Sequence, residues 1–311
     1  METVPIKFVI EVFNTACFPV TTVAHYNLSS SWGKIASDLC ENTKHYTLNV
    51  DCEENSVKCY FFVYGRFAAF QRDPIESITF KQFLVTDKRY HKINSVFINC
   101  GEEYLFWKPE DDDDDVDEDK VGTRNSYEIP ETQIEQLVKL VQTSFGSQGE
   151  DKMIIQEDPM NAPLDTFLNV VNKFYTVFTG KVFFTDYRLK YTGQESEEFL
   201  ADQVKNANKI YDLEIFGQWK KKSYKALQEV IKRPELTNLE AWNGVHLKVT
   251  LEFFKSIVND WMNNKRKADL KVKAFLNKMP AMEKKGKKNG KKGDKHFRFG
   301  QYNEGIYRNF C

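Results

Sequence analysis

The sequence predicts a mixed α/β protein in which a short helical module precedes an irregular, solenoid-like array of strand–helix units. The hydrophobic period is near 3.6 residues before residue 44 and changes to 2 after it, which marks a switch from helices to strands. Strand-like and helix-like segments then alternate from Lys181 to Met262. Hydrophobic residues make up 41% of the 311 residues, so the chain contains enough apolar material for a large core.

Residues 1–43 form the first predicted domain, a helical module. Pro5 suits a first helical turn, and Pro19 separates the first helix from a second. In the second helix Trp32 and Ile35 lie on one apolar face. Helices this short bury little surface, so the module needs a partner or a neighbouring domain.

Strands are predicted from Tyr46 onward, where apolar and polar residues alternate. Tyr46–Cys52 and Val57–Tyr64 are separated by a short polar turn, a pattern typical of a β-hairpin. Further strand-like segments occur at Ser77–Phe80 and Ser95–Cys100. The second predicted domain, residues 44–279, therefore begins with a sheet.

The formal net charge is only −1, but the chain contains one strongly acidic and one strongly basic segment. One is the acidic run within residues 109–124, which we expect to be a solvated loop because like charges repel. The other is a Lys/Gly tract in residues 280–311, which we expect to be a flexible basic tail. Between these blocks, Gln133–Phe145 and Leu164–Phe178 have helical periodicity.

Three strand–helix units follow Lys181, and LKVKAFL is a final candidate strand. If Phe184, Leu213, Leu239 and Val272 are equivalent inward positions, they are spaced by 29, 26 and 33 residues. A strand followed by a helix at this period is the layout of leucine-rich repeats. An ordinary α/β domain built from βα units is the alternative.

Alternation along these strands predicts which side chains face the core and which face a partner. The inward positions are Leu213, Ile215, Leu239 and Ala241. The outward positions, together with a tryptophan after the second strand, are the candidates for binding a protein substrate: Glu214, Phe216, Trp219, Glu240 and Trp242. Exposed aromatic side chains on such a face would indicate a binding surface.

No strong catalytic, cofactor or metal motif is present, so we expect a non-catalytic protein without cofactors. A phosphate-loop-like segment at 286–292 has the wrong spacing and Lys292 where a hydroxyl should be. The six cysteines and five histidines are dispersed without metal-site spacing. The start of the chain lacks signal-peptide features, and no apolar run approaches the ~20 residues of a membrane span. We therefore expect reduced cysteines, a cytoplasmic or nuclear location and no membrane partner.

The opening METVPIKFVIEVF, followed by LSSSWGKI, resembles a divergent F-box. That motif has an early proline, an apolar first helix and a late Ser-x-x-Trp helix. The segment from GKVFFTDYRL through LEFFKSIVNDW resembles the F-box-associated repeat region of nematode F-box proteins. Val4-Pro5 in place of Leu-Pro, and the extra Pro19, depart from the family pattern.

The resemblance implies that the protein is the substrate receptor of a Skp–cullin–F-box ubiquitin ligase. It implies that the N-terminal helices bind the Skp-type adaptor, and that the repeat domain captures a protein target. Members of these families also act as antidotes that direct a paired toxic protein to degradation. The matching positions make the following residues the adaptor-binding candidates: Val4, Pro5, Phe8, Val12, Leu28, Trp32 and Ile35.

Two other functions fit the sequence. The protein could be a scaffold or inhibitor that binds its partner by the repeat face without adaptor binding. It could instead be an RNA-associated protein, because clustered lysines in the basic tail neutralise phosphates and provide weak nucleic-acid binding.

Overall fold

The structure, a computed structural model, divides into two compact units, Met1–Val182 and Phe183–Cys311. This division differs from the predicted domain boundaries, which follow residues 43 and 279. The residues that the structure describes are 30–63, 76–100, 127–146, 151–157, 165–220, 222–242, 271–274, 297–302 and 305–310. The acidic run and the Lys/Gly tract lie outside these ranges, as does the helix predicted after Trp242.

The first unit is built on a mixed sheet with the strand order β6-β4-β1-β2-β3, and β5 also pairs with β2. The predicted hairpin is present, since β1 and β2 pair antiparallel and the Glu53 amide donates to the Ser56 carbonyl oxygen at 2.9 Å. Strands β1, β4 and β6 are parallel neighbours. The bounds are β1 Lys44–Cys52, β2 Val57–Val63, β3 Glu76–Ile78, β4 His91–Cys100, β5 Tyr127–Ile129 and β6 Lys152–Gln156.

Four helices of the first unit are described: α2 (Ser30–Asn42), α3 (Phe80–Leu84), α4 (Glu131–Ser144) and α5 (Asp165–Phe178). Helices α4 and α5 pack against each other and against β4. The predictions of α2, α4 and α5 are confirmed, because their apolar residues recur at helical spacing. The buried apolar residues of α4 include the four that this spacing selects: Ile134, Leu137, Val138 and Val141.

Helix α3 corrects the prediction of a strand over Ser77–Phe80, because only Glu76–Ile78 is extended. Thr79 begins the helix with a capping box, in which its hydroxyl accepts from the Gln82 amide and the Gln82 side chain accepts from the Thr79 amide. A Thr-x-x-Gln pattern before apolar residues is a sequence signal for a helix start. The Phe83 ring then stacks on Phe61 of β2 at 4.4 Å between centroids.

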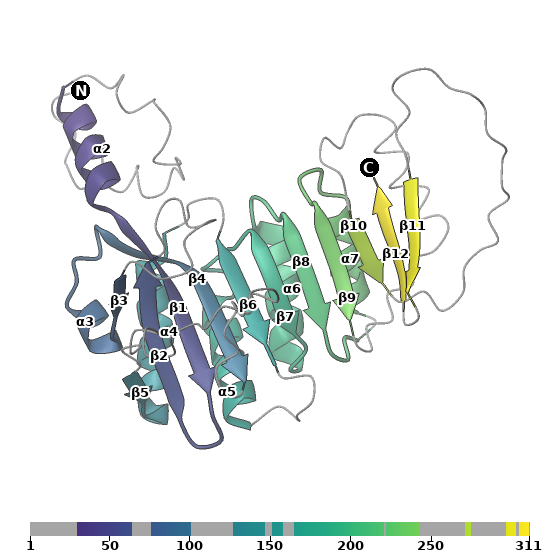
Figure 1. The fold of residues 1–311 in the computed structure, drawn as a ribbon, viewed down its shortest axis with the longest axis horizontal. Helices are drawn as coiled ribbons and strands as arrows, with labels where there is room; N and C mark the ends of the chain where they lie inside the picture. The colour runs from purple at the N-terminus through teal and green to yellow at the C-terminus, as the bar shows by residue number, and fades with distance from the viewer. Residues whose placement is uncertain are drawn as a thin grey trace, which may run out of the picture. The chain divides into compact units, whose positions relative to one another are not determined.

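The second unit begins with parallel strands that are neighbours in chain order, β7-β8-β9-β10, with α6 and α7 covering one face of their sheet (Figure 1). Strand β12 pairs antiparallel with β10 and forms a hairpin with β11. The bounds are β7 Asp186–Lys190, α6 Gln194–Asn206, β8 Asp212–Phe216, α7 Ser223–Ile231, β9 Asn238–Trp242, β10 Lys271–Ala274, β11 Phe297–Tyr302 and β12 Gly305–Phe310.

This arrangement confirms the strand–helix alternation, but it corrects two details of the prediction. The register partner of Leu213 is Tyr187, so Phe184 precedes the strand rather than belonging to it. The end of the predicted flexible tail also contains two strands, β11 and β12. The alternating aromatic residues of these strands are a period-2 signal.

Side-chain contacts with backbone groups hold the helices of the second unit. The Arg233 guanidinium donates to the carbonyl oxygens of Val204 and Ala207 at 2.5 and 2.8 Å, at the end of α6. At the start of α6, the Ser196 hydroxyl oxygen accepts from the Gly193 amide at 3.2 Å. Gly193 has φ +132°, a conformation that favours glycine. These contacts satisfy groups that a helix leaves without intrahelical partners.

Candidate protein-binding surfaces

Most of the predicted adaptor-binding residues lie before α2, outside the described residues: Val4, Pro5, Phe8, Val12 and Leu28. The other two, Trp32 and Ile35, lie on α2 itself. Ile35 is half-buried, and the side chain of Trp32 lies outside the described part. The structure therefore places the end of the predicted adaptor module on a helix that leads directly into β1.

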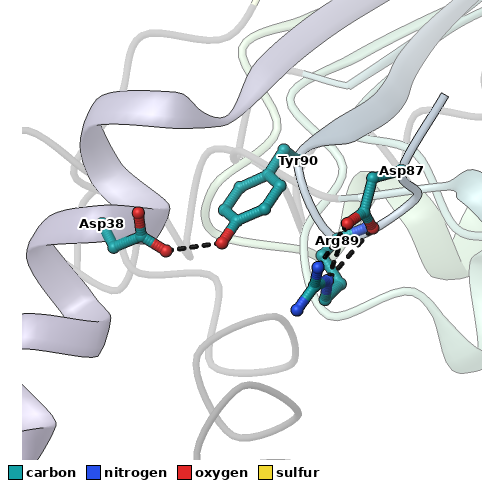
Figure 2. Close-up of polar contacts among 4 residues, drawn as sticks. All are labelled: Asp38, Asp87, Arg89 and Tyr90. Atoms are coloured by element: carbon teal, nitrogen blue, oxygen red, sulfur yellow. Dashed lines mark hydrogen bonds and ion pairs between the residues drawn. The ribbon is translucent and has the colours of Figure 1, made fainter.

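Helix α2 is attached to the start of β4 by a polar contact between residues far apart in sequence. The Tyr90 hydroxyl donates to an oxygen of the Asp38 carboxylate at 2.5 Å, as Figure 2 shows. This hydrogen bond to the Asp38 carboxylate raises the pKa of Tyr90, because it is formed only by the protonated hydroxyl. The sequence pattern of α2 identified its apolar face but not this contact.

The turn before Tyr90 is organised by an ion pair that appears in the same view (Figure 2). The Arg89 guanidinium contacts the Asp87 carboxylate at 2.5 Å, and these hydrogen bonds lower the pKa of Asp87 to about 2. The guanidinium carbon also lies 5.3 Å from the centroid of the Tyr90 ring. Both charged side chains are exposed, so we treat the pair as a local organiser of the turn rather than a major source of stability.

The predicted core of the second sheet is confirmed: Leu213, Ile215, Leu239 and Ala241 are all buried. The outward set is corrected in part. Phe216, Trp219 and Glu240 are also buried, at 6%, 3% and 6% exposure, while Glu214 is half-buried. Trp242 ends β9 beside Phe216, and its side chain lies outside the described residues.

Trp219 is buried because the loop after β8 turns back over the end of the sheet. Its indole N–H donates to the Phe216 carbonyl oxygen at 2.9 Å, and its ring packs edge-on against Tyr191 at 5.6 Å. Gly217 allows this turn with φ +92°. A tryptophan with its N–H satisfied by the backbone is a packing residue. Exposure cannot therefore be assigned from alternation alone where a loop folds back.

The half-exposed polar residues on this face include three that the sequence did not single out: Arg188, Asp212 and Asn238. Arg188 lies beside Glu214 in register, and their charged groups form an ion pair at 3.5 Å between Nε and Oε2. Asp212 lies beside Asn238, whose amide nitrogen donates to its carboxylate at 3.0 Å. Period-2 alternation places all four on one face with Glu240. The same pattern that selected Glu214 could thus have selected Arg188.

In the first unit, a buried polar cluster connects strands β1, β2 and β4. The Asn99 amide nitrogen donates to the Asp51 carboxylate at 2.7 Å and to the Asn49 side-chain oxygen at 2.9 Å. Asn49 in turn donates to Asp51 at 2.8 Å and to the Tyr60 hydroxyl oxygen at 2.5 Å. Buried polar groups of this kind stabilise a fold when they are mutually hydrogen-bonded.

Metal chemistry has no support in the described part of the chain. Within it, no group of three or more His, Cys, Asp or Glu side chains is arranged to hold a metal ion. The thiols of Cys52 and Cys59 are buried, and burial raises their pKa values well above the usual range of a thiol. Such thiols are poor nucleophiles and poor metal ligands.

The helices that the structure describes include none with the length and apolarity needed to cross a bilayer.

Comparison with known proteins found no matching family model, no similar curated protein and no similar solved structure. The resemblance to F-box proteins therefore rests on the sequence pattern alone.

Proposed function

We propose that this protein is the non-catalytic substrate-recognition subunit of a Skp–cullin–F-box ubiquitin ligase. In this proposal the N-terminal helices bind the Skp-type adaptor, which links the protein to the cullin ligase, and the strand–helix region binds a protein target. The complex acts in the cytoplasm, the nucleus or both. A role as the antidote to a paired toxic protein is one form of the same activity.

The observation that carries the proposal is the position of α2. The F-box resemblance requires a helix at the Ser-x-x-Trp segment, and Ser30–Asn42 is helical with Trp32 and Ile35 one turn apart. A single residue, Thr43, separates this helix from β1. A small apolar helical module joined directly to a larger α/β region suits a protein that bridges an adaptor and a target.

Target binding is proposed for the sheet face of the second unit that α6 and α7 do not cover. The burial of Phe216, Trp219 and Glu240 moves the candidates to the half-exposed residues of β7, β8 and β9. These candidates are Arg188, Asp212, Glu214 and Asn238. A leucine-rich-repeat-like solenoid is the finer form of this proposal, and the consecutive parallel strands β7 to β10 support it.

The test is a pull-down of the purified protein with the Skp-type adaptor. We expect stable binding by the wild type and its loss in a Pro5→Ala, Phe8→Ala, Trp32→Ala variant, because small interfaces depend on a few apolar anchors. The matched control is Leu84→Ala, Val85→Ala, which removes exposed apolar side chains elsewhere. Circular dichroism establishes that each variant is folded.

Two outcomes would contradict the proposal and favour another function. If a folded wild type does not bind the adaptor, the protein is better explained as a scaffold or inhibitor. If it instead binds RNA with a steep salt dependence that disappears on deletion of residues 283–295, the basic tail carries the function.

A further inference from the structure

Helix α2 and strand β1 are separated by one residue, Thr43. Asn42 ends the helix and Lys44 begins β1. The Thr43 amide donates to the Leu39 carbonyl oxygen at 2.9 Å, which extends the helical pattern to this residue. The Lys44 amide then donates to the Tyr90 carbonyl oxygen at 2.6 Å, so pairing with β4 starts at once. The chain therefore passes from helix to sheet without a flexible linker.

A hydrogen bond between residues far apart in sequence also connects α2 to the turn before β4. The Tyr90 hydroxyl donates to Asp38, which lies 52 residues earlier, at 2.5 Å (Figure 2). The other carboxylate oxygen of Asp38 accepts from the Asn42 side chain at 2.8 Å. This contact within α2 orients the carboxylate independently of Tyr90. The hydrogen bond is charge-assisted, although it lies at an exposed position where solvent reduces its strength. On the same helix, Leu39 is buried.

The donor side of this hydrogen bond is also held in place. The Tyr90 amide donates to the Asp87 carbonyl oxygen at 3.0 Å, and Arg89 lies over the Tyr90 ring while it pairs with Asp87. A side chain already held in a turn loses less conformational entropy when it forms a contact. Both partners of the Tyr90–Asp38 hydrogen bond are therefore oriented by other contacts, Asp38 within α2 and Tyr90 within its turn.

We propose that Asp38 and Tyr90 form a latch that holds α2 at a fixed angle to β1 and β4 of the same unit, so that α2 is presented in one orientation. The functional part of this inference rests on the proposed function. A ligase receptor must hold its target at a defined distance from the site of ubiquitin transfer. If α2 changed its angle freely, that distance would vary widely. In this scheme Tyr90 is a positioning residue that touches neither the adaptor nor the target.

The test measures the angle of α2 by the distance between two spin labels. The labels are placed at Lys34→Cys on α2 and Lys152→Cys on β6, both exposed positions. Cys17, Cys40 and Cys311 are replaced by serine, and the three buried cysteines are retained. Pulsed electron–electron double resonance of the full chain should give one narrow distance distribution. Tyr90→Phe should broaden it, because loss of this exposed hydrogen bond raises the ratio of detached to attached helix by about two- to fivefold.

A matched control is Tyr224→Phe, the same substitution at a half-buried tyrosine of α7, which should leave the distribution unchanged. Asp38→Ala removes the acceptor and should broaden the distribution as much as Tyr90→Phe, with no further change in the double variant. A broad distribution in the parent chain, or no change in either single variant, would overturn the latch.

The functional part is read from adaptor pull-down and from ubiquitin transfer to the receptor's own lysines in the reconstituted ligase. Tyr90→Phe should retain adaptor binding and change the pattern of modified lysines, whereas an unchanged pattern would refute the functional part. If the parent chain does not bind the adaptor, the proposed function fails while the distance measurement still decides the latch.

Discussion

The strands of the first and second units differ on the face that their helices leave uncovered. In the first unit, Asn49, Asp51 and Asn99 are buried at 7%, 8% and 5% exposure and bond to one another. In the second unit, Arg188 and Glu214 are half-exposed and form an ion pair. The first face is a polar layer of the fold, and the second presents charge at a surface. Polar residues at alternating strand positions therefore do not by themselves identify a binding face.

The largest expected effect tests this comparison directly. Asp51→Ala should destabilise the protein by about 3 kcal/mol, because the buried amides of Asn49 and Asn99 lose their shared acceptor. Glu214→Ala, the matched change on the strands of the second unit, should cost less than about 1 kcal/mol, because its half-exposed ion pair with Arg188 is in contact with solvent. Urea unfolding monitored by circular dichroism measures both. Equal effects would remove the distinction between the two faces.

A second prediction concerns the second unit, where the contacts of Arg233 with the end of α6 should contribute more stability than an exposed ion pair next to it. Arg233→Ala should cost about 2 kcal/mol, because two carbonyl oxygens at the end of α6 lose a charged donor. The control is Lys232→Ala, which removes an adjacent, exposed ion pair with Glu229 and should have little effect. Thermal unfolding of both variants tests the prediction, and a larger loss in Lys232→Ala would contradict it.

The third prediction tests whether the turn at Gly217 is responsible for the burial of Trp219. Gly217→Ala should cost about 1–2 kcal/mol, because alanine is strained at positive φ and its Cβ would lie 3.1 Å from the Tyr191 Cβ. Gly180→Ala provides the strain without the contact, since φ is +73° and no atom lies within 4 Å of the new Cβ. A greater loss of tryptophan burial in Gly217→Ala, measured by fluorescence quenching, would assign the difference to packing. Identical behaviour would show that backbone strain alone matters.

The smallest effect concerns the exposed turn beside the latch. The pKa of Asp87 falls from 3.8 to about 2 on folding, so the carboxylate stabilises the native state above pH 3.8 and this contribution is lost as the pH falls toward 2. Asp87→Asn should therefore lower stability slightly at pH 6 and match the wild type near pH 2. Denaturant titrations at the two pH values measure the difference. A deficit that persists at pH 2 would assign Asp87 an additional role.

Local pattern predicted much of the architecture. The hairpin, α4, α5, α6 and α7 follow from periods of 2 and 3.6, because each element buries one face. Strand β6 was missed because Met153–Ile155 is a short apolar run that no flanking period distinguishes from a loop. Helix α3 does not follow from hydrophobic period, because it is only five residues long and its capping box directly follows the strand residues Glu76–Ile78.

The candidate surfaces were less predictable than the elements. Alternation correctly identified Leu213 and Leu239 as core residues. It could not show that Trp219 returns to the sheet, because its indole contact is with a backbone carbonyl rather than with a residue at fixed spacing. Nor could it pair Tyr90 with Asp38, since a contact between residues 52 apart leaves no periodic trace in the chain.

The sequence by itself determined the mixed α/β class, the order of most elements and the inward positions of β8 and β9. These features depend on local conformational preference and hydrophobic period, which act over a few residues. Only the tertiary structure decided the strand order of the sheets, the buried cluster around Asp51 and the attachment of α2. Those features depend on which distant groups meet at hydrogen-bonding distance, and that is set by the packing of the whole chain.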